Sequence, residues 1–297
     1  MYKPQKILLV IDPEQKDQLA LDKVLKIAKH ANSEITLLSC EYTDYLSEGY
    51  YFNPVELAEL RQEYLKKRKL LLEEIAKPIR NSGTQVNTIS LWGHPAYEVI
   101  IEECNKIAAD LLVLPIERHG AFSRLFLQNS DWQVVRLCVV PTLLVKEKKW
   151  QDKPVMLAAV DPTHSRHKPS GLDHKILQTS LDFAKCIDAE VSAIHSYRPT
   201  AMSTAKPEEV RHQHKEAFSQ LMSDFDFSDD RQIFVEEVPE VGMEKAEAEL
   251  DVNIVVMGAI SRSRMTDVFI GNTTEKVIDF LESDVLVLKP DDFDGGL

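Results

Sequence analysis

A short segment near the C-terminus has the residue types and the spacing of a phosphate-binding loop. Glycine lets a backbone approach a phosphate closely, and threonine hydroxyls can donate hydrogen bonds to phosphate oxygens. An ordinary capped helix that binds nothing shows the same pattern, so the spacing alone leaves both interpretations open. The candidate residues are Gly258, Ser261, Gly271, Asn272, Thr273 and Thr274.

Two apolar, β-branched runs flank this segment and indicate what holds it. Residues 254–257 and 285–288 are typical of strands that are buried on both faces of a parallel sheet. Between them, apolar residues recur at helical spacing, and Asn272 and Glu275 have the spacing of a capping box. We therefore predict a helix whose free N–H groups and positive dipole end face an anion.

The segment resembles the nucleotide loop of the universal stress protein family, whose ATP-binding version reads Gly-x2-Gly-x9-Gly-Ser/Thr. Gly258 and Gly271 match this pattern. Ser261 occupies the place of the second glycine, and Asn272 precedes the hydroxyl residue Thr273. The resemblance implies a protein that supports survival under stress, including DNA-damaging conditions, without a defined catalysed reaction. It also implies ATP with Mg²⁺ as the ligand.

The chain contains the same unit twice, and the resemblance covers both halves. Residues 6–13 (Lys-Ile-Leu-Leu-Val-Ile-Asp-Pro) recur as residues 155–162 (Val-Met-Leu-Ala-Ala-Val-Asp-Pro). The expected strands are 6–13, 34–39, 85–91, 111–114 and 142–145, then 155–162, 190–195, 232–237, 254–257 and 285–288. The expected helices are 18–30, 54–77 and 96–107, then 176–187, 207–224 and 243–249, with one more before each last strand.

This alternation predicts an α/β fold, with helices on both faces of parallel sheets. We expect two tandem Rossmann-like, doubly wound domains of the adenine nucleotide alpha hydrolase-like type. Each would hold a five-stranded parallel sheet of order 3-2-1-4-5. The expected boundaries are 1–148 and 153–297, on either side of a short charged linker. Ligands of such sheets bind where the strand order reverses, beyond the carboxyl ends of strands one and four.

The ends of the first two strands in the second half complete the expected site. Adenine would lie against Val160, Asp161 and Ile194. The resemblance implies contact of Asp161 with the ligand or with Mg²⁺, although an Asp-Pro pair also commonly starts a turn. For the equivalent Asp12 we expect the turn alone.

The corresponding loop of the first half lacks this chemistry. Pro115 and Gln128 occupy the places of the two glycines. Proline removes an N–H donor, and glutamine adds a side chain where a phosphate would need close approach. A standard ATP site is therefore expected only in the second half.

Charge and composition exclude several classes of partner. The net charge of −13 argues against binding to nucleic acids or anionic membranes. No run of about 18 apolar residues is present, and the N-terminus lacks a signal peptide pattern. These features predict a cytoplasmic protein.

Neither a metal centre nor a disulfide framework is expected. The four cysteines occur singly in apolar segments, which indicates buried, reduced thiols. The histidines are scattered, and His212 and His214 would lie on different faces of one helix, so no metal site is predicted.

Three functions remain open at this point. The chain could be a nucleotide-binding module, or a signalling protein whose crevice holds a non-nucleotide, even apolar, ligand or none. It could also be a slow nucleotide hydrolase, although no positioned base, Gly-x-Ser-x-Gly elbow or His-Glu-x-x-His helix is visible. We therefore predict a non-enzymatic protein with a small-molecule ligand.

The last strand of each half would leave a sheet edge open. Family members pair through these strands as dimers. The resemblance therefore implies that residues 142–145 and 285–288 pair inside one chain as a pseudo-dimer, with a homodimer as the alternative.

Overall fold

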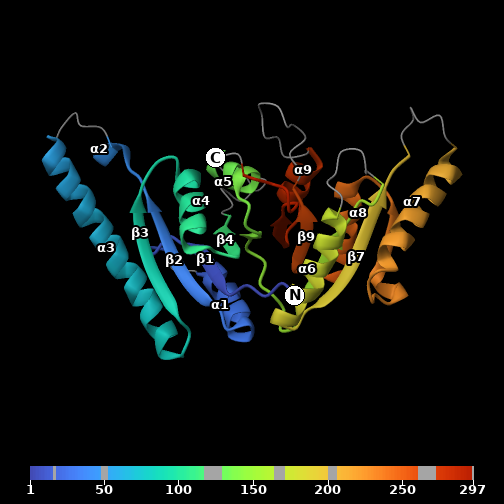
Figure 1. Ribbon diagram of the computed structural model, residues 1–297, viewed down its shortest axis with the longest axis horizontal. Helices are drawn as coiled ribbons and strands as arrows, with labels where there is room; N and C mark the ends of the chain where they lie inside the picture. The colour runs from blue at the N-terminus through green and yellow to red at the C-terminus, as the bar shows by residue number, and fades with distance from the viewer. Residues whose placement is uncertain are drawn as a thin grey trace. The chain divides into compact units, whose positions relative to one another are not determined.

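The computed structural model describes residues 1–15, 18–47, 53–116, 129–163, 171–199, 206–259 and 272–295, with the backbone alone at 129, 130, 272, 273 and 275. The chain forms two compact units, which are described separately (Figure 1). One contains Pro4–Pro115, and the other contains Leu143–Leu297 together with Met1–Lys3.

The first unit alternates strands and helices as the sequence predicts. Strands β1, β2 and β3 pair in parallel, and β4 lies on the other side of β1. The Leu112 N–H of β4 donates to the Pro141 carbonyl (2.9 Å), so the segment entering β5 lies beside β4. The order in this repeat is therefore 3-2-1-4-5, as predicted. The elements are β1 (Lys6–Val10), α1 (Leu19–Ala31), β2 (Glu34–Glu41), α2 (Asp44–Ser47), α3 (Pro54–Asn81), β3 (Val86–Trp92), α4 (Ala96–Ile107), β4 (Leu111–Pro115), α5 (Asn129–Leu137) and β5 (Thr142–Val145).

The second repeat has the same topology, with β6 paired in parallel between β7 and β9. Its strand order is β10-β9-β6-β7-β8, again 3-2-1-4-5 in the order of the repeat. The prediction of two separate five-stranded sheets differs from the structure in one detail: β5 is the hydrogen-bonded neighbour of β10, so the strands belong to one sheet. The elements are β6 (Val155–Ala159), α6 (Leu172–Ile187), β7 (Glu190–Tyr197), α7 (Pro207–Met222), the 3-10 turn η1 (Asp229–Arg231), β8 (Gln232–Glu236), α8 (Pro239–Leu250), β9 (Ile254–Gly258), α9 (Asn272–Phe280) and β10 (Asp284–Leu288).

Helices cover both faces of the sheet, which explains why central strands such as β1, β4 and β9 are apolar through most of their length. In β2, Glu41 contacts Arg68 of α3, whereas its neighbour Cys40 lies on the side of Glu103 of α4. Figure 1 shows these two helices on either side of β2 and β3. All five residues of β10 are buried. Among the residues that the structure describes, no helix is long and apolar enough to cross a membrane.

Several helix boundaries differ from the sequence prediction. Helix α3 continues to Asn81 through Pro78, where the prediction ended at residue 77. Proline removes only one hydrogen bond in the last turn, and that loss does not end a helix anchored by packing. Helix α3 also begins with a complete capping box between Asn53 and Glu56, which the sequence analysis did not identify. The short helix α2 was not predicted.

Four helices end on residues in the left-handed conformation: Asn32, Ala108, Asp188 and Asp251 have φ angles of 51–57°. Each backbone N–H bonds back to a carbonyl of the last turn, which satisfies an otherwise free acceptor. Asparagine and aspartate tolerate this conformation, whereas alanine is strained in it. Ala108 is therefore the unfavourable member of the group.

The strain predicts the effect of a substitution at Ala108. The change Ala108→Gly should stabilise the protein by about 0.5–1 kcal/mol, because the relief of strain exceeds the entropy that glycine adds to the unfolded chain. Urea denaturation measures the difference. Asn32→Gly, at an equally exposed helix end, should change stability by less than about 0.5 kcal/mol. A loss of stability in Ala108→Gly would contradict the prediction.

The cysteines are free thiols: Cys104, Cys138 and Cys186 are buried, whereas Cys40 is only half-buried. Burial, together with the nearby charges of Glu41 and Glu103, raises the pKa of the Cys40 thiol to about 12. The pKa of Cys104 is also raised, by its contact with Cys138 and by burial. Because the thiolate is the reactive form, these thiols should be inert near neutral pH.

Thiol labelling tests this environment directly. In the folded protein at pH 8, Ellman's reagent should react with Cys40 and Cys104 far more slowly than with free cysteine. In concentrated urea, all four cysteines should react rapidly. Fast labelling of the folded protein at these two positions would show that they are exposed.

Candidate functional site

Three neighbouring strands of the second repeat end at one edge of the sheet, and this edge carries the candidate site. Ala159 of β6 stands beside Ile194 of β7, and Ala158 stands beside Val256 of β9. The Val160 N–H donates to the Ile194 carbonyl at 3.0 Å, which continues the pairing past the end of β6. The structure therefore brings Val160, Asp161, Ile194 and Gly258 to the same edge.

Asp161 is held there by local hydrogen bonds. Its N–H donates to Asp173 Oδ1 of α6 at 3.0 Å. Its Oδ1 atom accepts from the Thr163 hydroxyl at 2.9 Å and from the Thr163 N–H at 3.4 Å. This is the turn that an Asp-Pro sequence favours, and it points the carboxyl group back over the turn. The arrangement orients Asp161 whether or not a ligand is bound.

Gly258 has a packing role that the sequence analysis did not identify. A Cβ atom at this position would lie 2.7 Å from Leu172 Cδ2 at the start of α6. Leu172 is buried and belongs to the core between α6 and β9. A side chain at this position would make Leu172 shift, so the glycine favours close packing of helix and strand independently of a phosphate.

The remaining predicted residues are described in part. Helix α9 begins at Asn272, as expected, and the Thr274 side chain is buried. The side chains of Asn272 and Thr273 are not described. Ser261 and Gly271 lie outside the described residues, so the loop itself stays a prediction.

A histidine pair beneath this edge was not predicted. His195 of β7 is fully buried, and its Nδ1 atom lies 3.1 Å from the Val160 carbonyl. Its Nε2 atom lies 2.8 Å from Nδ1 of His214 in α7. Since a carbonyl only accepts, we infer that His195 carries its proton on Nδ1 and that His214 Nδ1–H donates to His195 Nε2.

The pair connects the two candidate residues at the end of β6. Thr163 Oγ1 lies 3.4 Å from His214 Nδ1 and also bonds Asp161. A polar chain thus runs from the Val160 carbonyl through His195, His214 and Thr163 to the Asp161 carboxyl group. It ties helix α7 to the strand edge where the candidate site lies.

Aromatic rings enclose this histidine pair. Tyr197 stacks on His214 and on Phe234, with centroids 4.7 and 4.9 Å apart. The Tyr197 hydroxyl donates to Glu236, and burial together with this carboxylate raises the tyrosine pKa. The signal in the sequence was the position of His195, which lies two residues from Ala193 and from Tyr197 and therefore shares one face of β7 with them and with Val191. Because the partner histidine lies on a separate helix, the spacing of the histidines along the chain gave no sign of the pair.

In the first repeat, a cluster of charged side chains lies at the corresponding position. Arg68 of α3 is buried, and its guanidinium donates to Glu41 Oε1 (2.5 Å), Asp12 Oδ1 (2.6 Å) and Glu14 Oε2 (2.9 Å). Burial lowers the pKa of Arg68, but its bonds to Glu41 and Asp12 outweigh this effect and raise it. The guanidinium therefore stays charged.

Asp12 makes the turn expected for it, because its carboxylate accepts the Glu14 N–H at 3.0 Å. It also binds Arg68, which the sequence did not indicate. Three carboxylates around one guanidinium leave this edge negative, and that charge disfavours a phosphate. Among the residues that the structure describes, no group of three or more histidine, cysteine, aspartate or glutamate side chains could hold a metal ion.

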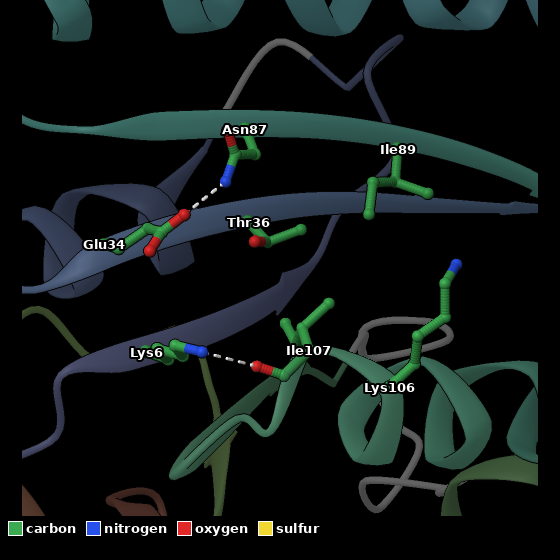
Figure 2. A pocket seen from close by; sticks show the side chains of 7 residues that line it. All are labelled: Lys6, Glu34, Thr36, Asn87, Ile89, Lys106 and Ile107. Carbon is green, nitrogen blue, oxygen red and sulfur yellow. Dashed lines mark hydrogen bonds between the residues drawn. The ribbon is translucent and has the colours of Figure 1, made fainter.

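A cavity of about 300 Å³ lies at the opposite ends of the strands in the first unit (Figure 2). Lys6, Glu34 and Asn87 stand at the amino ends of β1, β2 and β3. The Lys6 ammonium donates to the Ile107 carbonyl at 3.1 Å, and Asn87 donates to Glu34. Lys6 thereby binds the C-terminal end of α4, where a positive charge is favourable. Ligands of doubly wound sheets bind at the other end, so this cavity is separate from the candidate site.

Known proteins resemble the chain over nearly its whole length. Residues 3–146 and 156–289 match the sequence profile described as the Universal stress protein family. Universal stress protein E of Escherichia coli K12 is 27% identical over 300 residues, which cover 97% of this chain and 95% of that protein. A crystal structure of a putative universal stress protein from Pseudomonas aeruginosa UCBPP-PA14 has a TM-score of 0.79 and 27% identity, covering 98% of this chain and 95% of that chain. A universal stress protein from Archaeoglobus fulgidus has a TM-score of 0.67 at 18% identity, covers 96% of this chain and 98% of that chain, and shares the fold.

The ionic cluster of the first repeat predicts a large effect on stability. Arg68→Met removes the cation from the buried carboxylate of Glu41, and an unpaired buried charge costs about 3–5 kcal/mol. Urea denaturation at neutral pH measures the loss. Adding Glu41→Leu should restore most of it, because no buried charge then remains.

The neighbouring residue provides the control. Lys67 lies on the same helix and forms an exposed ion pair with Glu63 at 3.1 Å. Lys67→Met removes the same charge but should cost less than about 1 kcal/mol. Equal effects of the two substitutions would show that Arg68 contributes no more than a surface cation.

Proposed function

The chain belongs to the universal stress protein family, and from that premise we propose that it acts in the stress response by binding a nucleotide, ATP with Mg²⁺, in its second repeat. The proposal rests mainly on the convergence of the β6, β7 and β9 ends at one edge, with Asp161 at the turn after β6. Helix α9 follows the loop after β9 and supplies the free N–H groups of a helix N-terminus. This is the end of a doubly wound sheet where ligands bind.

The adenine would contact apolar side chains rather than the main chain of β6. The Val160 N–H is bonded to the Ile194 carbonyl, and the Val160 carbonyl accepts from His195. Val160 and Ile194 therefore form a wall whose main-chain bonds are already made; both are buried, at 6% and 1% exposed, so an adenine would displace the side chains that cover them. Asp161 is the charged group at this wall, where its carboxyl group would meet the ligand or Mg²⁺.

The phosphates would lie at the loop from Gly258 to Thr274, next to the start of α9. The first repeat offers no equivalent. Its edge carries the carboxylates of Asp12, Glu14 and Glu41 around Arg68, and like charges repel a triphosphate. Nucleotide binding is accordingly assigned to the second repeat alone.

Pairing of the two fifth strands inside one chain is part of the proposal. Strands β5 and β10 are hydrogen-bonded neighbours, which supports a pseudo-dimer in which the edge of β10 is covered without a second chain. The domain boundaries near residues 148 and 153, the cytoplasmic location and resistance to DNA damage stay predictions. That the protein binds its ligand without catalysing a reaction also stays a prediction.

The test is mass spectrometry of small molecules released from the purified protein, followed by calorimetric titration with ATP and Mg²⁺. The wild type should bind ATP with a Kd of about 1–100 μM, an ordinary range for a small-molecule ligand. Gly271→Gln, which installs the residue of the first repeat, should weaken binding at least about tenfold, equal to about 1.4 kcal/mol.

The reciprocal change is the matched control. Gln128→Gly alters the equivalent position of the first repeat and should leave ATP affinity unchanged. Failure of the wild type to retain or bind any nucleotide would overturn the proposal. A non-nucleotide molecule found in the released fraction would favour the alternative of a signalling protein with a different ligand.

A further inference from the structure

A buried lysine holds the C-terminal end of helix α9. The Lys146 ammonium donates to the Ile278 and Leu281 carbonyls, both at 2.6 Å, and the residue is only 3% exposed. Lys146 directly follows β5, and it belongs to the same compact unit as α9. The contact therefore joins residues that are more than 130 positions apart in the sequence.

The chemistry of this contact is favourable at a helix end. The last carbonyls of a helix have no partner within the helix and carry the negative end of its dipole. A buried ammonium needs strong acceptors to offset the loss of hydration. Lys146 meets both requirements at once, since its ammonium donates to two carbonyls at the end of the helix.

A second anchor fixes the same segment to the start of β10. The carboxylate of Asp284 is fully buried and accepts the Lys146 N–H and the Trp150 Nε1–H, both at 2.7 Å. From the other side, the buried Glu247 of α8 accepts the Glu282 N–H at 2.9 Å in the turn that follows α9. The end of α9 is thus held by hydrogen bonds from two directions.

The other end of α9 carries the proposed phosphate site. The helix has nine residues, so it is about 13 Å long. Val277 and Ile278 of the helix, and Leu281 directly after it, are fully or almost fully buried and set its distance from the sheet. Lys146 sets where the helix ends along its axis, and therefore where its N-terminus lies.

We propose that Lys146 is a positioning residue for the nucleotide site of the second repeat. It acts through α9, so that the site is complete only when the segment from β5 to Trp150 is present. This inference rests on the proposed function. If the N-terminus of α9 were displaced, its backbone N–H groups would no longer point at the phosphates. The wall of Val160 and Ile194 on β6 and β7, which would hold the adenine, would be unaffected.

The matched control is Lys148, two residues further along the same segment. Its ammonium donates to the Val252 carbonyl at 2.7 Å and pairs with Asp251 at 2.7 Å, at the end of α8. Lys146→Met and Lys148→Met make the same change in charge and volume. They differ in the helix whose end is released and in burial, because Lys148 is half-buried whereas Lys146 is buried.

The experiment compares the affinities of ATP and adenosine in the full chain by calorimetry. Lys146→Met should weaken ATP binding about tenfold or more, while the affinity for adenosine changes less than about twofold. Lys148→Met should leave both affinities within about twofold of wild type. Lys146→Arg, which keeps the charge, should recover part of the ATP affinity. An equal loss for ATP and adenosine would indicate general disruption and overturn the inference.

The two proposals fail in different ways. If the wild type binds ATP and Lys146→Met binds it equally well, the positioning role is wrong and the nucleotide site stands. If the wild type binds no nucleotide, the proposed function is wrong. Hydrogen exchange then tests whether Lys146 holds the end of α9. The α9 amides should exchange at least about tenfold faster in Lys146→Met than in Lys148→Met. If Lys146→Met does not fold, Trp150→Phe provides a second test, because it removes one hydrogen bond to Asp284. This variant should also lose affinity for ATP but not for adenosine, by a smaller factor. An unchanged affinity for ATP in Trp150→Phe would overturn the inference.

Discussion

The candidate site depends on the parallel pairing of β6 with a strand on each side. Because β7 and β9 run in the same direction as β6, their carboxyl ends reach one edge. Loops from distant parts of the sequence then start close together, and one edge gathers Asp161, Gly258 and the buried His195. The central strands β6 and β9 are covered on both faces, which is why they are almost entirely apolar, whereas β7 also carries buried polar residues such as Ser192 and His195.

The parts of the fold that depend on apolar patterning could be predicted from the sequence. The strand order of each repeat, the strand at 142–145 and the helix at 96–107 agree with the structure. Boundaries set by packing or by single hydrogen bonds were predicted less well. Helix α8 begins at Pro239 rather than at residue 243, and α6 begins at Leu172 rather than at 176. The first turn of a helix is polar and carries little periodic signal, so its start depends on tertiary contacts.

The polar interior could not be predicted in the same way, because it depends on which side chains meet. Arg68 occupies a position on the buried stripe of α3, between Tyr64 and Leu72, where a spacing argument expects an apolar residue. Its partner Glu41 ends β2, and nothing in the sequence indicates that the two lie together. The histidine pair had a weak signal in the alternation of β7, but its partner on α7 had none. Composition and hydrophobic periodicity indicate which face of a helix or strand is buried. They do not indicate which buried polar side chains pair, because that depends on which residues are neighbours in three dimensions.

The two repeats place different polar groups beneath their long helices. Beneath the long helix of each repeat, the end of the second strand needs a buried polar partner. The first repeat uses the guanidinium of Arg68, which binds the carboxylates of Asp12, Glu14 and Glu41. The second uses the rings of His195 and His214, with Asp161 beside Val160. The two halves therefore share a scaffold, whereas the polar groups buried beneath the long helix differ, and those groups are set by single side chains that the repeat pattern does not constrain.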